Sequence, residues 1–384
     1  MASSLLDLRP DTSPSSDDTF RFGIEEEYFL GDATTMAVAS RTPEALFNKL
    51  AENGGVIKRE MLQAQIEIAT RPHTDTSSAR RELQELRETA AQAAAEHGLM
   101  ILACGTHPTA LWRGIQQSPK ARYDDVMECL QMLGQRNMVC GMHVHVEVPE
   151  PERRIDIMAR MTPYLPLLIA LSTSSPFWQS QCTGLKSYRL AAYDELPRTG
   201  IPELFRCSED YESYLSALTS SGAIEDATHL WWSIRPSQTY PTLELRATDS
   251  CTRVDDALAI AVLYRCMVRS LYRNPAMNAE VGAVDRAIAV EKKWRAQRYG
   301  VEGTFVTKHG AVSIPDMLEQ VIEEIEADVE ALDCLDEIYH CRSIAADGTS
   351  ADAQLRLFRQ HRARGSDAAL QVVTRWIADA TLAA

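Results

Sequence analysis

Alternating hydrophobic and polar residues mark four segments of the chain as strands of a sheet with one polar face. These segments are residues 20–30 (FRFGIEEEYFL), 61–70 (MLQAQIEIAT), 140–148 (CGMHVHVEV) and 242–249 (TLELRATD). Side chains of an extended strand point alternately to opposite faces, so the polar residues of each segment lie together on one side. Residues 99–104 (LMILAC) are apolar throughout and predict a further, buried strand.

Apolar residues at helical spacing predict the remaining regular elements. Helices are expected at about residues 76–97, 123–134, 155–171, 254–272 and around 317–332. Pro163 and Pro166 must bend or break the third of these helices. Strands concentrate in the first two thirds of the chain and helices in the last third, which predicts an α+β fold. Residues 1–19, rich in Ser, Asp, Thr and Pro, are expected to be a disordered lead-in. Residues 20–384 are then expected to form a single domain with a helical carboxyl-terminal part.

Composition narrows the range of partners. The formal net charge is −15, from 39 basic and 54 acidic residues, and no cluster of basic residues is present. Nucleic acids and anionic membranes are bound by clustered basic groups, so neither is an expected partner. No run of 18 apolar residues exists, and the amino terminus lacks the features of a signal peptide. The nine cysteines include no CxxC pair, which favours reduced thiols in a cytoplasmic protein.

Each polar strand face carries a pair of groups that can bind a metal or a phosphate. The pairs are Glu25 with Glu27, Gln65 with Glu67, His143 with His145, and Glu244 with Arg246. Taken singly, each pair has a structural interpretation: a solvated edge strand, a cross-strand salt bridge, hydrogen-bonded histidines, or an exposed charge pair. Adjacent carboxylates on one strand face also repel each other unless a cation or an arginine lies between them.

Taken together, the four pairs favour a metal site built mainly from carboxylates. Such a set suits Mg²⁺ or Mn²⁺ better than Zn²⁺, which prefers cysteine and histidine. An arginine beside a metal-binding glutamate, as in Glu244-x-Arg246, is also what phosphoryl transfer requires. The chain contains no P-loop and no GxGxxG motif, so a nucleotide must be held through its metals and through arginines.

The order of these motifs resembles that of the bacterial type 2 glutamate–cysteine ligase family, also called the carboxylate–amine ligases. The resemblance extends from about residue 20 to residue 303. It rests on FGIEEEYFL, LQAQIEIAT, CGTHP, CGMHVHVEVP, LSTSSPFWQ, HLWWSIRPS, TLELRATDS and KKWRAQRYG, in that order. It implies the glutamine synthetase-like catalytic fold: a curved, largely antiparallel sheet, flanked by helices, whose concave face holds ATP, Mg²⁺ (or Mn²⁺) and an amino-acid substrate.

The resemblance also implies a role for individual residues. The positions that match metal ligands are Glu25, Glu27, Glu67, His143 and Glu244. His145 is expected near the ATP phosphates and Arg246 near the γ-phosphate, both as catalytic residues. Contacts to substrate carboxylates or phosphates are expected from Arg235, Arg295 and Arg298, for which structural ion pairing is the alternative. A homodimer is expected from the resemblance as well.

Two segments depart from the family pattern. Lys292 stands where an asparagine is expected in the last motif, and QCTGLKS (181–187) differs from the usual version that contains Gly and Asp. Substrate contacts in the second segment are therefore in doubt. Cys182 invites a nucleophile interpretation, but no histidine is near it in the sequence, and a buried or incidental thiol is preferred.

The function that follows is ATP-dependent ligation of a carboxylate to an amine. The expected reaction joins L-glutamate to L-cysteine through an acyl phosphate and yields γ-glutamylcysteine, ADP and phosphate. One alternative is a zinc-dependent metallohydrolase that uses His143, His145 and carboxylates to activate water. A second alternative is a binding protein that keeps the ligase fold without turnover.

Overall fold

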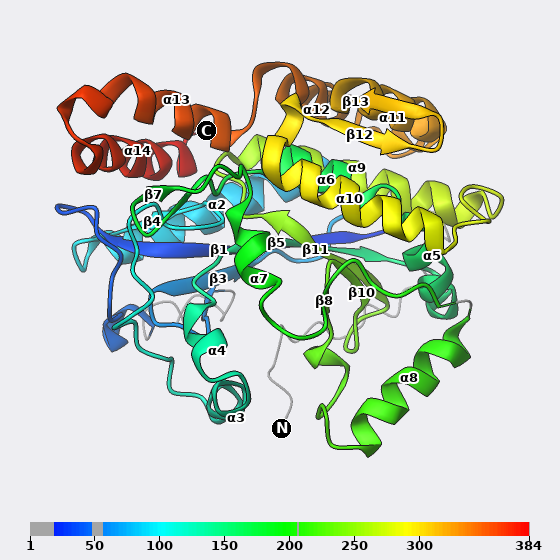
Figure 1. Cartoon of the computed structure of the whole chain (residues 1–384), viewed down its shortest axis with the longest axis horizontal. Helices are drawn as coiled ribbons and strands as arrows, with labels where there is room; N and C mark the ends of the chain where they lie inside the picture. Colours follow the sequence, from blue (N-terminus) through cyan, green and yellow to red (C-terminus); the bar gives the residue numbers. More distant parts are fainter. Residues whose placement is uncertain (1–18, 48–56, 206, 384) are drawn as a thin grey trace.

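The structure is a computed structural model that describes residues 19–47, 57–205 and 207–383 (Figure 1). The expected lead-in of residues 1–19 lies, except for Thr19, outside the described residues. Described residues from both ends of the chain meet in the core: β1 (Phe22–Asp32) pairs with β4 (Leu99–Leu102), against which the last helix, α14 (Ser366–Thr381), packs.

The centre of the molecule is a seven-stranded antiparallel sheet. Its strand order is β10-β11-β5-β1-β3-β2, and β4 pairs with the end of β1. The strands not yet delimited are β2 (Ile57–Arg59), β3 (Gln65–Ala69), β5 (Gly141–Glu147), β10 (Ile234–Pro236) and β11 (Thr242–Asp249). Every pair in this sheet is antiparallel. The predicted strands are therefore confirmed, and so is the antiparallel sheet that the resemblance implied.

The alternation of polar and apolar residues gives the sheet one apolar face and one polar face. Ile24, Ile66, Ile68, Val144 and Val146 are all fully or almost fully buried on the apolar face. That face is covered by α2 (Thr76–Ala95), α6 (Leu165–Ser172) and α9 (Val254–Arg273), which lie above the sheet in Figure 1. Burial of the apolar face against helices fixes the strand register, because a slip of one residue would turn every polar side chain into the core.

The remaining helices form an outer layer and the walls of the polar face. The outer layer contains α10 (Ala283–Tyr299), α11 (Ile314–Ala331), α12 (Leu335–Asp347) and α13 (Ser350–His361). On the polar side, below the sheet in Figure 1, lie α3 (Ala121–Leu130), α4 (Met132–Arg136), α7 (Tyr188–Tyr193) and α8 (Ser208–Ser220). Short strand pairs complete the structure: β6 (Phe177–Trp178) with β7 (Gln181–Cys182), β8 (Thr199–Gly200) with β9 (Trp231–Trp232), and β12 (Thr304–Thr307) with β13 (Gly310–Ser313).

The prolines break the predicted helix over residues 155–171, as expected. It consists of α5 (Arg154–Met161) and α6, with Pro163 in the break and Pro166 in the first turn of α6. Among the described residues no single helix is long and apolar enough to span a membrane. One bent pair, Pro151–Met161 with Leu165–Ser172, passes that test only when both halves, which meet at 73°, are counted together. The β12–β13 hairpin was not predicted, because the last third of the chain was expected to be helical.

Candidate active site

The polar face of the sheet is the floor of a cleft of about 510 Å³. Strand alternation points Glu25 and Glu27 of β1 into this cleft, and antiparallel pairing sets a ligand beside each of them. Glu25 lies opposite His143 of β5, and Glu27 lies opposite Glu67 of β3. On the next strand pair, Glu244 of β11 lies opposite His145. The four motifs predicted to share a face therefore do so, on four adjacent strands.

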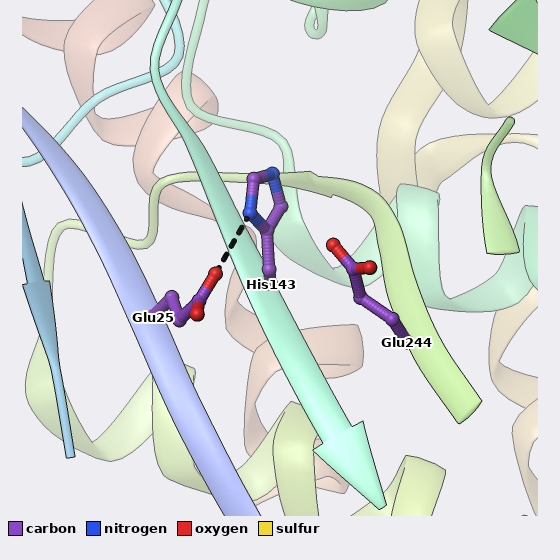
Figure 2. Close-up of side chains that lie close together, drawn as sticks. All are labelled: Glu25, His143 and Glu244. Carbon is purple, nitrogen blue, oxygen red and sulfur yellow. Dashed lines mark ion pairs between the residues drawn. The ribbon is translucent and has the colours of Figure 1, made fainter. Parts of the chain in front are cut away.

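Glu25, His143 and Glu244 form the first cluster of ligands (Figure 2). One ligand atom from each lies within 4.8 Å of the others. Nδ1 of His143 is 3.5 Å from Oε2 of Glu25, and Nε2 of His145 is 3.7 Å from Oε1 of the same carboxylate. Burial acts to raise the pKa of Glu25, but His145 and His143 outweigh it and hold the pKa below its ordinary value. Burial and the charge of Arg246 lower the pKa of His143, which favours the neutral imidazole that can bind a metal.

Glu244 is also the point where two arginines converge. Arg235 of β10 donates from Nε to Oε2 of Glu244 at 2.7 Å and from Nη2 to Oε1 at 3.3 Å. Arg246 donates from Nη1 to Oε1 of the same carboxylate. Burial acts to raise the pKa of Glu244, but Arg235 and Arg246 hold it well below the ordinary value. The carboxylate is thus fully ionised and fixed in position. Both oxygens of Glu244 accept hydrogen bonds from arginines. A cation that binds Glu244 must therefore compete with Arg235 and Arg246 for the same carboxylate.

Arg246 keeps hydrogen-bonding capacity for a ligand. It lies where the register of β11 shifts between Leu245 and Thr248, an irregularity that re-aims the side chains of a strand. Its Nη2 donates to the hydroxyl of Tyr193 at 3.3 Å. Its Nε is buried and has no hydrogen-bond partner within the described residues. A buried donor without a partner is costly, and a phosphate or carboxylate oxygen of a substrate can satisfy it.

A second cluster contains three carboxylates without a balancing arginine. One oxygen each of Glu27, Glu60 and Glu67 lies within 4.8 Å of the others. Oε2 of Glu27 accepts a hydrogen bond from the backbone N–H of Gly141 at 2.6 Å. Burial and the neighbouring charge of Glu27 raise the pKa of Glu60 from 4.5 to about 7. Burial, with the charges of Glu25 and Glu60, raises the pKa of Glu67 well above its usual range. In the absence of a cation, the surroundings of Glu60 and Glu67 therefore favour the protonated form of each carboxyl group.

The chemistry of these donors fits a hard divalent cation. Five carboxylates and one imidazole make up the two clusters, and oxygen-rich sets of this kind suit Mg²⁺ or Mn²⁺. Burial and the repulsion between neighbouring carboxylates together raise the pKa values of Glu60 and Glu67, and a bound cation would relieve the repulsion. Zinc fits less well, because it prefers histidine and cysteine ligands. The two clusters together contain one histidine and no cysteine.

A second buried arginine, Arg189 of α7, closes one side of the cleft. Both of its Nη atoms are 3.3 Å from the backbone oxygen of Arg246, and its Nε has no hydrogen-bond partner in the described part of the chain. Its guanidinium occupies the space where a Cβ at position 141 would lie, since that Cβ would be 2.1 Å from Nη2. Gly141 therefore lets Arg189 approach the sheet.

The structure does not bring every predicted site residue to the cleft. Arg295 and Arg298 lie on α10 and are absent from the lining of the cleft. Arg295 donates from Nη2 to the hydroxyl of Thr304 at 2.7 Å, and Arg298 stacks over Tyr299 at 4.9 Å. Both interactions lie within the protein and outside the cleft, but neither is the ion pair that was the alternative for these arginines. Cys182 is exposed on β7 and also lies outside the cleft lining.

Sequence reasoning missed several residues that line the cleft. Glu60 follows a three-residue strand with no alternating pattern, so nothing in the sequence marked it as a ligand. Arg189 and Tyr193 lie on a six-residue helix with no recognised motif. Lys58 also lines the cleft, and its buried Nζ has no hydrogen-bond partner among the described residues. Lys58 lies opposite Glu67 in the β2–β3 pair. This pairing could have placed Lys58 in the cleft, but only if the register of the two strands had been known.

Comparisons with known sequences agree on one family. The model of glutamate–cysteine ligase family 2 matches residues 21–371. Two bacterial relatives carry the provisional name glutamate–cysteine ligase 2. The one from Bradyrhizobium diazoefficiens is 54% identical over 364 residues, which are 94% of this chain and 84% of the relative. The one from Rhodospirillum rubrum is 43% identical over 369 residues, which are 94% of this chain and 95% of the relative.

Two solved structures share the fold at 15% sequence identity. A glutamate–cysteine ligase from Francisella tularensis, in complex with AMP, superposes with a TM-score of 0.72 over 95% of this chain and 89% of its own. A bifunctional glutathione synthetase from Pasteurella multocida superposes with a TM-score of 0.71 over 94% of this chain and 52% of its own. At this identity the likeness concerns the fold alone, and it extends over almost the whole chain.

Proposed function

The chain belongs to glutamate–cysteine ligase family 2 and is an ATP-dependent ligase, and we propose that it joins the γ-carboxylate of L-glutamate to the amine of L-cysteine. The observation that carries the proposal is the convergence of two carboxylate clusters and two arginines on one cleft. The clusters can bind the cations that accompany ATP, and the arginines can neutralise a phosphoryl group in transfer. No Gly-rich phosphate loop is then required.

Two groups of residues are proposed to hold Mg²⁺ (or Mn²⁺). Glu25, His143 and Glu244 form one site, and Glu27, Glu60 and Glu67 form the other. When bound, these ions would draw the ATP phosphates into the cleft and offset their negative charge. Glu60 is added to the ligands that the sequence suggested, because its oxygen lies with those of Glu27 and Glu67.

The arginines of the cleft are proposed to have different roles. Arg246 has an unpartnered buried Nε and is proposed to contact the transferring phosphoryl group. Arg235 donates to both oxygens of Glu244 and to the backbone oxygens of Thr228 and Leu230. It is therefore proposed to position Glu244, more than to contact a substrate. Arg189 makes no salt bridge with a carboxylate of the described residues, although its charge acts on Asp249, and it is proposed to bind a substrate carboxylate.

His145 is proposed to act near the ATP phosphates. Its Nδ1 is 2.9 Å from the hydroxyl of Thr242, and its Nε2 faces Glu25 at 3.7 Å. Burial acts to lower the pKa of His145, but the charge of Glu25 outweighs it and raises the pKa above the ordinary value. An imidazole whose protonated form is favoured beside the cleft can donate a hydrogen bond to a phosphate oxygen.

The reaction follows from these positions in two steps. An oxygen of the glutamate γ-carboxylate attacks the γ-phosphorus of ATP, ADP leaves, and an acyl phosphate forms. The amine then attacks the acyl carbon through a tetrahedral intermediate, and phosphate leaves with one oxygen of the original carboxylate. Arg246 lowers the barrier by compensating charge on the transferring group, and the cleft holds the two reactants in reach of each other.

An isotope experiment tests the acyl phosphate. Glutamate labelled with heavy oxygen in its side chain is expected to yield labelled phosphate, together with ADP. Hydroxylamine is expected to replace the amine and to accumulate as a hydroxamate. A Glu244→Gln variant serves as the control, because it should abolish both signals. Formation of AMP, or of unlabelled phosphate while product accumulates, would overturn the mechanism.

The alternatives considered from the sequence receive no support. A zinc hydrolase would need a histidine-rich site, whereas carboxylates dominate both clusters. A ligase-fold protein without turnover would not need to bury an ionised glutamate between two arginines beside its ligands. Metal analysis together with an ADP-release assay separates the hydrolase from the ligase.

The expected setting of the enzyme is part of the proposal. All nine cysteines are free thiols, which supports a cytoplasmic location. The homodimer rests on the family resemblance, and light scattering after gel filtration would test it by giving the mass of the assembly in solution.

A further inference from the structure

Lys292, the residue that departs from the family motif, does not reach the catalytic cleft. It lies on α10 and lines a separate pocket of about 200 Å³. The pocket lies between α10, the β12–β13 hairpin above it in Figure 1, and Pro163 in the break between α5 and α6. None of its lining residues belongs to the cleft. The departure at position 292 therefore changes this pocket and leaves the ligands of the cleft unaltered.

Lys292 is largely buried and makes no ion pair within residues 19–47, 57–205 and 207–383. The residue is 6% exposed, and its ammonium group keeps some contact with solvent and makes no hydrogen bond to those residues. Among them, the ring of Phe305 lies near the ammonium group, with its centroid 5.6 Å from Nζ. Burial lowers the pKa of Lys292, and Asp285 counteracts this only in part. A cation–π contact of this length compensates a buried ammonium weakly.

The one carboxylate of the pocket is already engaged. Oδ1 of Asp285 is 2.7 Å from Nζ of Lys308, and its Oδ2 accepts a hydrogen bond from the backbone N–H of Gly282 at 3.1 Å. Lys308 and Asp285 therefore cancel, and the pocket keeps the single positive charge of Lys292. The chain has a net charge of −15, so this pocket is a local positively charged site in a protein that is negatively charged overall.

An ammonium group at the end of a mostly buried side chain is poorly hydrated, and a bound anion would stabilise its charge. We propose that this pocket binds a small oxyanion, a carboxylate or a phosphate group, whose oxygens accept hydrogen bonds from the ammonium group of Lys292. Lys308 and His309 line the same pocket and offer further hydrogen-bond donors. Ile288, Ala289 and Pro163 form an apolar wall that suits a short carbon chain. The volume is below that of a drug-sized site, so the ligand is small.

Two substitutions at Lys292 test this site, with one at a distant residue as control. Lys292→Asn introduces the residue expected from the motif, and Lys292→Met keeps the apolar stem without the charge. Arg356→Met removes one positive charge from an exposed position on α13, outside both pockets. Thermal unfolding of each protein is followed during titration with propionate or inorganic phosphate, at constant ionic strength maintained with sodium chloride.

The wild type and Arg356→Met are expected to show a saturable rise in melting temperature with at least one of the two anions. Both Lys292 variants are expected to bind that anion at least about tenfold more weakly, because a charge-assisted hydrogen bond is lost. Phosphate in the catalytic cleft and general salting effects act on all four proteins alike, so only the difference at Lys292 counts. Identical titrations in all four proteins would overturn the proposal.

A chemical readout keeps the test decisive if a variant unfolds. Acetylation of Lys292 in the wild type by an N-hydroxysuccinimide ester is measured by peptide mass spectrometry. The rate is expected to fall by half at the anion concentration that half-saturates the rise in melting temperature, while acetylation of Lys186, which lines neither pocket, serves as the internal reference. Acetylation that is indifferent to both anions would also overturn the proposal. Neither measurement depends on ligase activity. The anion site and the proposed ligase reaction can therefore be confirmed or refuted independently of each other.

Discussion

The strand β1 carries three consecutive glutamates, which lie in different surroundings on its two faces. The glutamate on the core face is paired with an arginine, whereas, within the described part of the chain, the two on the cleft face are not. Glu26 points away from the cleft and is fully buried. Its Oε1 is 2.5 Å from Nη2 of Arg87 and its Oε2 is 2.9 Å from Nε of the same guanidinium. Tyr28 donates its hydroxyl to the same carboxylate. Glu25 and Glu27, one residue to either side, point into the cleft, and neither makes a salt bridge with an arginine of the described residues.

On the core face, every hydrogen-bond donor of Arg87 has an acceptor. Beyond Glu26, its guanidinium donates to the backbone oxygens of Thr252, Cys251 and Thr381 at 2.8, 2.8 and 3.1 Å. One side chain thus ties β1 to α2, to the segment after β11 and to the end of α14. Every donor of this guanidinium has a fixed acceptor inside the protein, as a buried ion pair requires.

The cleft face follows the opposite rule. Glu27, Glu60 and Glu67 lie close together and, among the described residues, make no salt bridge with an arginine, although the charges of Lys58 and Lys120 act on the cluster. Within the same part of the chain, Arg246, Arg189 and Lys58 each keep a buried donor without a hydrogen-bond partner. Charges that the protein leaves uncompensated are available to compensate those of ATP, metal and substrate. Among the three glutamates of β1, residue type does not separate the structural carboxylate from those of the cleft, whereas the presence of an arginine partner does.

The largest contrast is expected between substitutions of adjacent residues. Glu26→Gln should reduce the free energy of unfolding by about 3–5 kcal/mol, because it leaves the buried charge of Arg87 uncompensated. Glu25→Gln should change the free energy of unfolding little and nearly abolish ATP turnover, because it removes a proposed metal ligand. Denaturant unfolding and ADP release measure both quantities in both variants.

Each variant is the control for the other, since both replace a glutamate of β1 by its amide. Comparable losses of stability in the two variants would remove the distinction between the faces. Full ATP turnover in Glu25→Gln, in a protein that remains folded, would exclude Glu25 from the site.

A smaller effect is expected when Arg246 is replaced by lysine. The charge remains, but the fork of donors that can follow the transferring phosphoryl group is lost. The value of kcat should fall by a factor on the order of 10²–10³, while the KM for ATP changes much less. Steady-state kinetics against ATP separates the two parameters. A rise in KM alone would show that Arg246 binds the ground state only.

The matched control for Arg246 is Arg295→Lys. Arg295 lies on α10 and bonds Thr304 outside the cleft, so its replacement should leave kcat nearly unchanged. A large loss of kcat in this variant would restore the role that the sequence suggested for Arg295.

The smallest expected effect is a pH dependence of stability in the absence of metal. The pKa of Glu60 is raised from 4.5 to about 7 in the folded state, so folding favours its protonated form. Its contribution to stability is complete below about pH 4.5 and is lost as the pH rises through 7. The loss should be on the order of 1–3 kcal/mol, and Glu60→Gln should remove it.

Urea unfolding in EDTA between pH 4.5 and 8 measures this difference between wild type and variant. Other groups also contribute to the pH profile of each protein, so the difference between the two profiles is informative, and not the slope of either one. Adding Mg²⁺ should stabilise the wild type above pH 7 more than Glu60→Gln. Parallel pH profiles would mean that Glu60 is not held near the other carboxylates.

Much of the fold was predictable because its signals are local. Period-two alternation identified β1, β3, β5 and β11, and it correctly set Glu25 with Glu27, and His143 with His145, on shared faces. Proline chemistry located the break between α5 and α6. These inferences depend only on residues a few positions apart, and so they required no knowledge of distant partners.

Which glutamate serves the core and which serves the cleft was decided by tertiary structure. The alternation put Glu26 opposite Glu25 and Glu27, but its partner Arg87 is 61 residues away, and no local pattern announces that pairing. Glu60 joined Glu27 and Glu67 only because β2 and β3 form a hairpin beside β1. Conversely, Arg295 matched a motif and still points to Thr304. The sequence by itself determined which side chains share a strand face, because backbone geometry requires it. The completeness of each charge's partners depends on segments brought together from distant parts of the chain, and only the folded structure could decide it.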